Sequence, residues 1–388
     1  MAPVALSRIL SFAALLTSYA AAQAPTQSGT SGAPGSSITA PPTASAPLAA
    51  TTPVSTFPAT PLVDKHFTYP SGIPYQVDPE TDLIRGPQSG YNICNSTTEG
   101  PNSRCQTMFF SSIDDFCLWG PPVLNGLVAD NEGEMVAYCT KPGRGTRLIP
   151  ANALQGVQWI KTPSYISAVG FINQAMIDMN STDYGGELDP HGADLRGNPK
   201  GGLVFSQAYT PGQWEQISEW NNFMGANTFC FKACDPSVAG SRKYCQNIYD
   251  RIGCAYNIPS NAQNGTFEVC QGDNQDPPGI YTSNGVVMTY TQPPESLGPI
   301  TTMPYTPVVP ASSSCTQYQS SSLYTAIATV SPPGATSTAS GSGSSGAKPS
   351  GSGSGSGSKG SGSSNGATTL AISGLSFMGV VFSALFLS

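Results

Sequence analysis

The stretch QWIKTPSYISAVGFINQAMI, residues 158–177, decides the fold class. β-Branched and aromatic residues fill 158–161 and 165–177, and turn-forming residues separate the two runs. This composition is typical of strands. Similar runs recur at 203–209 and 286–291. We therefore expect an α+β or mainly β domain, built on antiparallel strands.

Two other stretches show helical spacing. In TPGQWEQISEWNNFMG (210–225), that spacing links Trp214, Ile217, Asn221 and Met224, with Thr210 as a candidate cap before Pro211. In KYCQNIYDRIGC (243–254), one face would hold Cys245, Ile248, Tyr249 and Ile252. We expect two short helices here, packed on one side of the strands.

The ten cysteines predict a disulfide framework, because their number is even and no C-x-x-C pair occurs. They are Cys94, Cys105, Cys117, Cys139, Cys230, Cys234, Cys245, Cys254, Cys270 and Cys315. Local pairs of Cys117 with Cys139 and of Cys234 with Cys245 are expected. Cys315 lies beyond the core and is expected to tie the following segment back onto it.

Both ends of the chain carry targeting patterns. Arg8, an apolar run and three small residues predict a signal peptide over 1–22, cleaved before Gln23. Small residues before an apolar tail predict a glycosylphosphatidylinositol (GPI) attachment signal over 365–388, with Asn365 as the attachment site and 361–364 as alternatives. A tail-anchored helix is the other interpretation. The sequons at Asn95, Asn180 and Asn264 predict N-glycosylation.

Composition divides the rest of the chain. Residues 23–61 form a Pro/Ser/Thr-rich arm, and 331–364 a Ser/Gly-rich tether; both are expected to be disordered and glycosylated. Between them we expect one disulfide-rich globular domain at 62–292 and a post-core segment at 293–330. The predicted location is extracellular, at the cell surface or wall, with the lipid anchor in the outer leaflet of the plasma membrane.

Several function classes are excluded. The net charge of −7 argues against a nucleic-acid partner. Two histidines, His66 and His191, are too few for a His-rich zinc site, and the G-x-S-x-G match at 362–366 falls in the tether. A copper mono-oxygenase would need histidine where Gln23 is expected. We expect no cofactor and no metal, although calcium bound by carboxylates stays open.

The loop GGELDPHGADLRGNPKGG, residues 185–202, is the candidate binding loop. Its candidate residues, with one preceding acid, are Asp183, Glu187, Asp189, His191 and Asp194. Glycines and prolines favour a rigid series of tight turns, and a glycan or ion site is the alternative. Paired carboxylates for glycoside hydrolysis are a further alternative, with candidates Asp114, Asp115, Glu132, Glu134, Glu187 and Asp189. The acids of IDDF and NEGE are expected in solvated turns.

The four tryptophans, Trp119, Trp159, Trp214 and Trp220, can present flat rings to sugars or pack in the core. Core packing is favoured for Trp214, and both interpretations stay open for Trp119 and Trp220.

Five blocks carry a family resemblance: CQTMFFSSIDDFCLWGPP, KPGRGTRLIP, DYGGELDPHGADLRGNPKGGLVFS, WNNFMGANTFCFKACD and YCQNIYDRIGCAYN. In this order they resemble fungal secreted macrophage-activating glycoproteins, over 91–292 and on to PASSSC. The resemblance implies a surface glycoprotein and no catalytic residues. We expect a non-catalytic role in surface structure or in host or environmental interaction, with cell-wall glucan or host glycans as partners. The alternative is a polysaccharide-binding module or a carboxylate-based glycoside hydrolase.

Overall fold

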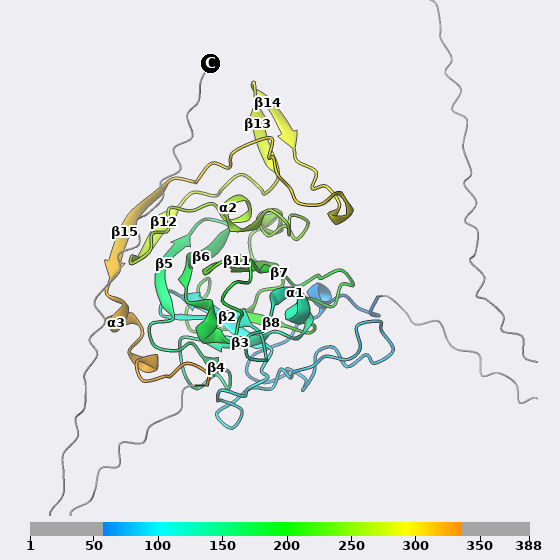
Figure 1. The fold of residues 1–388 in the computed structure, drawn as a ribbon, viewed down its shortest axis with the longest axis vertical. Helices are drawn as coiled ribbons and strands as arrows, with labels where there is room; N and C mark the ends of the chain where they lie inside the picture. The colour runs from blue at the N-terminus through cyan, green and yellow to red at the C-terminus, as the bar shows by residue number, and fades with distance from the viewer. Residues whose placement is uncertain (1–56, 335–388) are drawn as a thin grey trace, which may run out of the picture.

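A computed structural model describes residues 57–334 (Figure 1). The predicted signal peptide, most of the arm, most of the tether and the attachment signal at Asn365 lie outside the described residues. No helix within 57–334 combines the length and apolar character needed to span a membrane.

Two sheets form the body of the domain. The six-stranded sheet has the order β4 (Arg147–Leu148), β3 (Val136–Cys139), β2 (Asp115–Gly120), β1 (Thr107–Ser112), β8 (Leu203–Ser206), β9 (Glu215–Gln216). The seven-stranded sheet has the order β15 (Ser312–Tyr318), β12 (Phe267–Gly272), β5 (Leu154–Lys161), β6 (Tyr165–Ile172), β11 (Thr228–Cys234), β10 (Trp220–Gly225), β7 (Gly186–Leu188). Neighbours run antiparallel except in the pairs β1–β8, β3–β4 and β5–β12.

The remaining elements are short. A separate hairpin of β13 (Ile280–Ser283) and β14 (Val286–Thr289) projects from the body (Figure 1). The α-helices are α1 (Val128–Asn131), α2 (Gly253–Asn257) and α3 (Ser320–Leu323). Single 3-10 turns are η1 (Leu62–Asp64), η2 (Glu132–Glu134), η3 (Gln174–Ile177), η4 (Ser241–Tyr244), η5 (Glu295–Leu297) and η6 (Thr325–Ile327). The expected α+β, mainly β class is confirmed.

Aromatic side chains join the two sheets face to face. The Phe110 ring of β1 lies 4.5 Å from Trp159 of β5 and 4.3 Å from Phe231 of β11, measured between ring centroids. Trp119 of β2 lies 6.0 Å from Trp220 of β10. These contacts across the layer make a sandwich core. The open question for Trp119 and Trp220 is thereby answered, since both are buried in the core.

The expected strands are present with shorter bounds. The runs at 158–161 and 165–177 contain the end of β5 and all of β6, and 174–177 turns into η3. Residues 203–209 contain β8, whose parallel pairing with β1 places it in the six-stranded sheet. Residues 286–291 contain β14, whose side chains are exposed in the projecting hairpin.

The two helix predictions are wrong in position. Residues 210–225 contain β9 and β10. In β10, Trp220 and Met224 face the core and the residues between them alternate between the two faces of the sheet. The strand is paired on both edges, with β7 on one side and β11 on the other. Residues 243–254 contain only the end of η4 and the start of α2. Ile248 is 58% exposed there whereas Cys245 and Tyr249 are buried, so these residues do not form one covered helical face. Trp214 packs at the core edge against Tyr69 and Phe109.

All ten cysteines are paired, as expected. The five bonds are Cys94–Cys105, Cys117–Cys139, Cys230–Cys254, Cys234–Cys245 and Cys270–Cys315. They include both expected local pairs, and Cys315 ties β15 to β12. The two bonds from β11 hold the segment that follows it over the outer face of the seven-stranded sheet.

Candidate functional site

The outer face of the seven-stranded sheet carries the candidate site. On β10, Trp220 faces the core, so the period of two turns Asn221 and Phe223 outward. Glu187 of β7 lies opposite Phe223 in the antiparallel register, and therefore shares this outer face. The side chain of Asn221 donates to the carbonyl of Gln246 at 3.2 Å, which connects the sheet to the covering segment.

A cleft of ≈ 1200 Å³ opens between this face and the covering segment. Its walls come from β7 and β10 on one side and from 247–254 and 289–295 on the other, and α1 lies beside β7 (Figure 1). The titratable residues lining it are Glu132, Tyr184, Glu187, Asp189, Tyr249, Asp250, Arg251, Tyr290 and Glu295. Pockets for small ligands hold about 300–1,000 Å³, so this cleft has room for a polymer segment.

Glu187 is the most unusual group in the cleft. The residue belongs to the cleft wall and is only 6% exposed, and its two carboxyl oxygens are shielded from solvent, with the Asn221 side chain beside them. Burial raises the pKa of Glu187 well above its usual range, and the negative charges of Asp189 and Asp250 add to the effect. The nearby Asn221 side chain and the Lys232 ammonium oppose it more weakly. The protonated form of Glu187 is therefore favoured.

Two more acids in the cleft are shifted in the same direction. Burial raises the pKa of Asp189, although its Oδ1 accepts backbone N–H bonds from His191 at 2.7 Å and Gly192 at 2.8 Å. Burial also raises the pKa of Glu132, where Arg85 opposes the shift and Asp189 adds to it. Three neighbouring carboxyl groups in one cleft thus resist ionisation.

Lys232 lies under the covering segment, on the outer face of β11. Its ammonium donates to the carbonyls of Tyr244 at 3.0 Å and Asn257 at 2.6 Å, and to Gln275 Oε1 at 2.8 Å. Burial lowers the pKa of Lys232 well below its usual range, and the charge of Glu187 opposes that shift. Because all three donors are used, Lys232 anchors the covering segment and has none left for Glu187.

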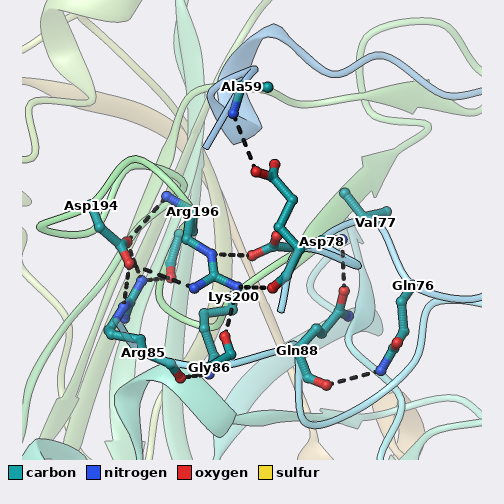
Figure 2. Close-up of polar contacts among 12 residues, drawn as sticks. Ala59, Gln76, Val77, Asp78, Arg85, Gly86, Gln88, Asp194, Arg196 and Lys200 are labelled. Carbon is teal, nitrogen blue, oxygen red and sulfur yellow. Dashed lines mark hydrogen bonds and ion pairs between the residues drawn. The ribbon is translucent and has the colours of Figure 1, made fainter. Parts of the chain in front are cut away.

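Other charges of the 185–202 loop fix it to the segment at 78–88 (Figure 2). Arg85 Nε donates to Asp194 at 2.7 Å, and Lys200 Nζ donates to the Arg85 carbonyl at 2.7 Å. Arg196 is fully buried and donates to Asp78 Oδ2 at 2.5 Å. The loop is therefore held by ion pairs as well as by its turns.

The remaining predicted residues shape the walls. Asp183 accepts from the N–H of Val128 at 2.7 Å and of Gly185 at 2.9 Å, which joins α1 to the start of the loop. The His191 ring lies 3.1 Å from Glu219 Oε2. Of the five predicted loop residues, the structure brings Glu187 and Asp189 together in the cleft. It places Asp183, His191 and Asp194 in supporting contacts.

A close approach of two backbones sets the cleft rim. Gly185 has φ +83° and Gly225 has φ +146°, and a Cβ on Gly185 would lie 1.5 Å from the Met224 carbonyl oxygen. Only glycine permits this contact. It leaves Tyr184 at the rim with 91% of its surface exposed.

Of the other candidate acids, only Glu132 lines the cleft. Asp115 pairs with Arg144 at 2.6 Å and Asp114 with Lys141 at 3.0 Å, both away from the cleft. Glu134 is exposed, as expected, whereas Glu132 lines the cleft. Within residues 57–334, the one group of three possible metal ligands whose atoms lie within 4.8 Å is Glu268 with disulfide-bonded Cys270 and Cys315. The acids of the candidate loop do not form such a group.

Sequence reasoning missed the far wall of the cleft. Asp250, Tyr249 and Tyr290 come from segments separated from the loop in the chain, and no local motif marks them. The sequon residues Asn95 and Asn264 are exposed and Asn180 is partly exposed. Their glycosylation stays a prediction.

Two fungal relatives match the chain. The appressorium protein ROW2 of Mycosarcoma maydis is 46% identical over 215 residues, which cover 54% of this chain and 73% of ROW2. The appressorium protein ROW1 of the same fungus is 44% identical over 200 residues, which cover 51% of this chain and 46% of ROW1, so this match spans less than half of ROW1. No family model matches the chain. No solved structure matches it either.

Proposed function

The chain belongs to the family of the appressorium protein ROW2, and on that premise we propose that it is a fungal surface glycoprotein that binds polysaccharide in its cleft during host or environmental contact. The names of ROW1 and ROW2 support an infection-related setting. The resemblance to macrophage-activating glycoproteins supports the same surface role. Secretion, N-glycosylation at the three sequons and a lipid anchor at Asn365 belong to this proposal.

The single observation that carries the proposal is the chemistry of the cleft. The partly exposed Glu132 and the exposed Asp250 and Glu295 line the cleft, and their carboxyl groups can accept hydrogen bonds from sugar hydroxyls. The exposed ring of Tyr184 at the rim offers a flat apolar face to a sugar ring. A cleft of this volume with both groups fits several sugar units better than a single small molecule.

Among Glu132, Glu187 and Asp189, no two groups show the contrast expected of a hydrolase acid and base. Glycoside hydrolysis needs one protonated acid and one ionised carboxylate facing the same bond. Such a pair is recognised when the environment moves the two pKa values apart. The environment raises the pKa of Glu132, Glu187 and Asp189 alike. Hydrolysis is the second candidate, because Glu187 and Asp189 line one wall, and release of reducing ends from β-glucan or chitin would establish it.

Replacing Tyr184 by alanine is expected to weaken polysaccharide binding about threefold to tenfold, because an exposed ring at the cleft rim loses its contact with a sugar face. The measurement is the Kd of the full chain for soluble β-glucan and chitin oligomers. Tyr318→Ala is the matched control, since Tyr318 is 41% exposed on β15, at the opposite edge of the same sheet. Equal affinities for both variants and the wild type, or no binding by the wild type, would contradict the proposal.

A further inference from the structure

One of the five disulfides differs from the others in its exposure. In the Cys270–Cys315 bond, Cys315 is exposed and Cys270 is fully buried. The other eight cysteines are all buried or partly buried. Access to a sulfur atom is one of the factors that set the rate of thiol–disulfide exchange. A thiol in solution therefore meets Cys315 before any other cysteine of the domain.

The strand that carries Cys315 is weakly held by its other contacts. Among the described residues, β15 is an edge strand that pairs with β12 alone, and all seven of its residues are exposed (Figure 1). The register of this pairing shifts between Val269 and Gln271, which marks a bulge. On the β15 side of the bulge, Ser314 has φ +54°. Buried side chains contribute little to holding β15, so the disulfide carries much of its attachment.

The direction of the S–S bond favours attack at Cys315. Phe267 and Val269 of β12 pack on the core side, so Cys270 points to the opposite, outer face of the sheet. The bond crosses from β12 to β15, and beyond β15 no further strand follows among the described residues. A thiolate that approaches Cys315 Sγ in line with the bond therefore comes from the open edge of the sheet. The buried Cys270 offers no such approach.

We propose that Cys270–Cys315 is a thiol–disulfide exchange site for a dithiol, and that its reduction releases β15 from the sheet. One thiolate of the dithiol bonds to Cys315 Sγ, the S–S bond breaks, and Cys270 leaves as a thiolate. The second thiol then attacks the dithiol's own sulfur in the mixed disulfide and frees Cys315. The dithiol is oxidised to a disulfide, and its two protons pass to the two cysteines. This inference goes beyond the proposed function and does not depend on what the cleft binds.

The release is local because both ends of β15 keep other anchors. Tyr324 and Ile327 follow β15 and are buried in the main core. The Tyr324 hydroxyl donates to the Ile113 carbonyl at 3.1 Å. Before β15, the Asp273 N–H donates to the Ala311 carbonyl at 2.9 Å. Reduction therefore opens 312–318 and leaves the edge of β12 unpaired, while the body of the domain stays folded.

Glu268 controls how readily the bond is reduced. A carboxylate oxygen of Glu268 lies within 4.8 Å of both sulfur atoms. Gln158 Nε2 donates to Glu268 Oε1 at 2.7 Å, which holds this carboxylate in place. Attack by a thiolate spreads negative charge over three sulfur atoms, and two of these lie beside Glu268. Repulsion between like charges therefore slows the exchange.

Graded reduction of the full chain by dithiothreitol under native conditions, followed by alkylation and mass spectrometry, tests the inference. Cys270 and Cys315 are expected to be alkylated at least about tenfold faster than any other cysteine. Amide hydrogen exchange in this singly reduced protein is expected to rise at 312–318 and to stay unchanged in β6. Earlier alkylation of another pair, or alkylation of all ten cysteines together, would overturn the inference.

A double variant tests whether the disulfide holds the strand. Cys270→Ala with Cys315→Ala is expected to exchange as fast at 312–318 without reductant as the reduced wild type does. Protection of 312–318 in this variant at the level of the oxidised wild type would show that the bond does not hold β15, and it would overturn the inference.

A second variant tests the role of Glu268. Glu268→Gln is expected to be reduced about threefold to tenfold faster than the wild type, because the repelling charge is removed. Glu134→Gln is the matched control, since Glu134 is an exposed acid on η2, and it is expected to be reduced at the wild-type rate. Equal rates for the two glutamine variants would overturn the assignment of Glu268.

Discussion

Replacing Arg196 by methionine is expected to lower the free energy of unfolding by about 3–5 kcal/mol, because it leaves a buried carboxylate without its partner. Arg196 is fully buried, with Nε donating to Asp78 and Nη2 to the Gly86 carbonyl at 2.7 Å (Figure 2). Asp78 is equally inaccessible. Chemical denaturation of the variant and the wild type at neutral pH provides the measurement.

Two controls show whether the pair or the lost volume is responsible. The double variant Asp78→Asn with Arg196→Met removes both charges and is expected to be more stable than the single variant. Arg242→Ala removes an arginine whose side chain is 74% exposed, and a change within about 1 kcal/mol is expected. An Arg196→Met variant as stable as Arg242→Ala would show that the loop does not depend on this ion pair.

Glu187→Gln is expected to make the protein more stable near neutral pH and to change little in acid. The folded state holds the Glu187 proton above the unfolded pKa of about 4.5, so the folded state binds more protons than the unfolded state. Stability therefore falls as pH rises from that value to the folded pKa. Glutamine has no proton to lose, and its gain is about 1.4 kcal/mol for each unit between the folded and unfolded pKa.

Denaturant titrations of both proteins at a series of pH values check this result. Glu134→Gln is the matched control, because Glu134 has an exposed side chain just outside the cleft. The two glutamine variants should diverge as the pH rises and converge near pH of about 4, where glutamate is largely protonated in both states. A pH-independent difference between Glu187→Gln and the wild type would contradict burial of an acid that resists ionisation.

The strands and the local disulfides were predictable because their signals are local. β-Branched and aromatic runs mark β5, β6 and β8, and Cys117 and Cys139 lie on neighbouring antiparallel strands. The apolar residues of the 210–225 stretch fit the spacing of a helix, and Trp220 and Met224 also fit one face of a strand. Only its pairing with β7 and β11 decides for the strand. The β11 partner follows directly after a short turn, whereas β7 lies far earlier in the chain, so no local pattern predicts the pairing with β7.

The candidate site likewise depends on contacts between segments that no local sequence pattern predicts. Glu187 and Asp189 are identified in the sequence because charges among glycines and prolines mark a shaped loop. The outward position of Glu187 follows from the register of β7, which the sequence does not reveal, and Asp189 follows just after that strand. Asp250 reaches the opposite wall through the covering segment, held by Cys230–Cys254. The expected rigid loop and the alternative binding site are compatible, since buried ion pairs behind the loop hold the acids in place.

The central claim is that a polysaccharide lies between β7 and the covering segment. Amide hydrogen exchange of the full chain, with and without saturating chitin oligomer or soluble β-glucan, tests that location most directly. The account predicts slower exchange at 184–193, 247–254 and 289–295, which form the two walls. The smaller pocket at 97–103, on another part of the surface, should be unchanged. Protection at 97–103 with no change in the cleft walls would contradict the account.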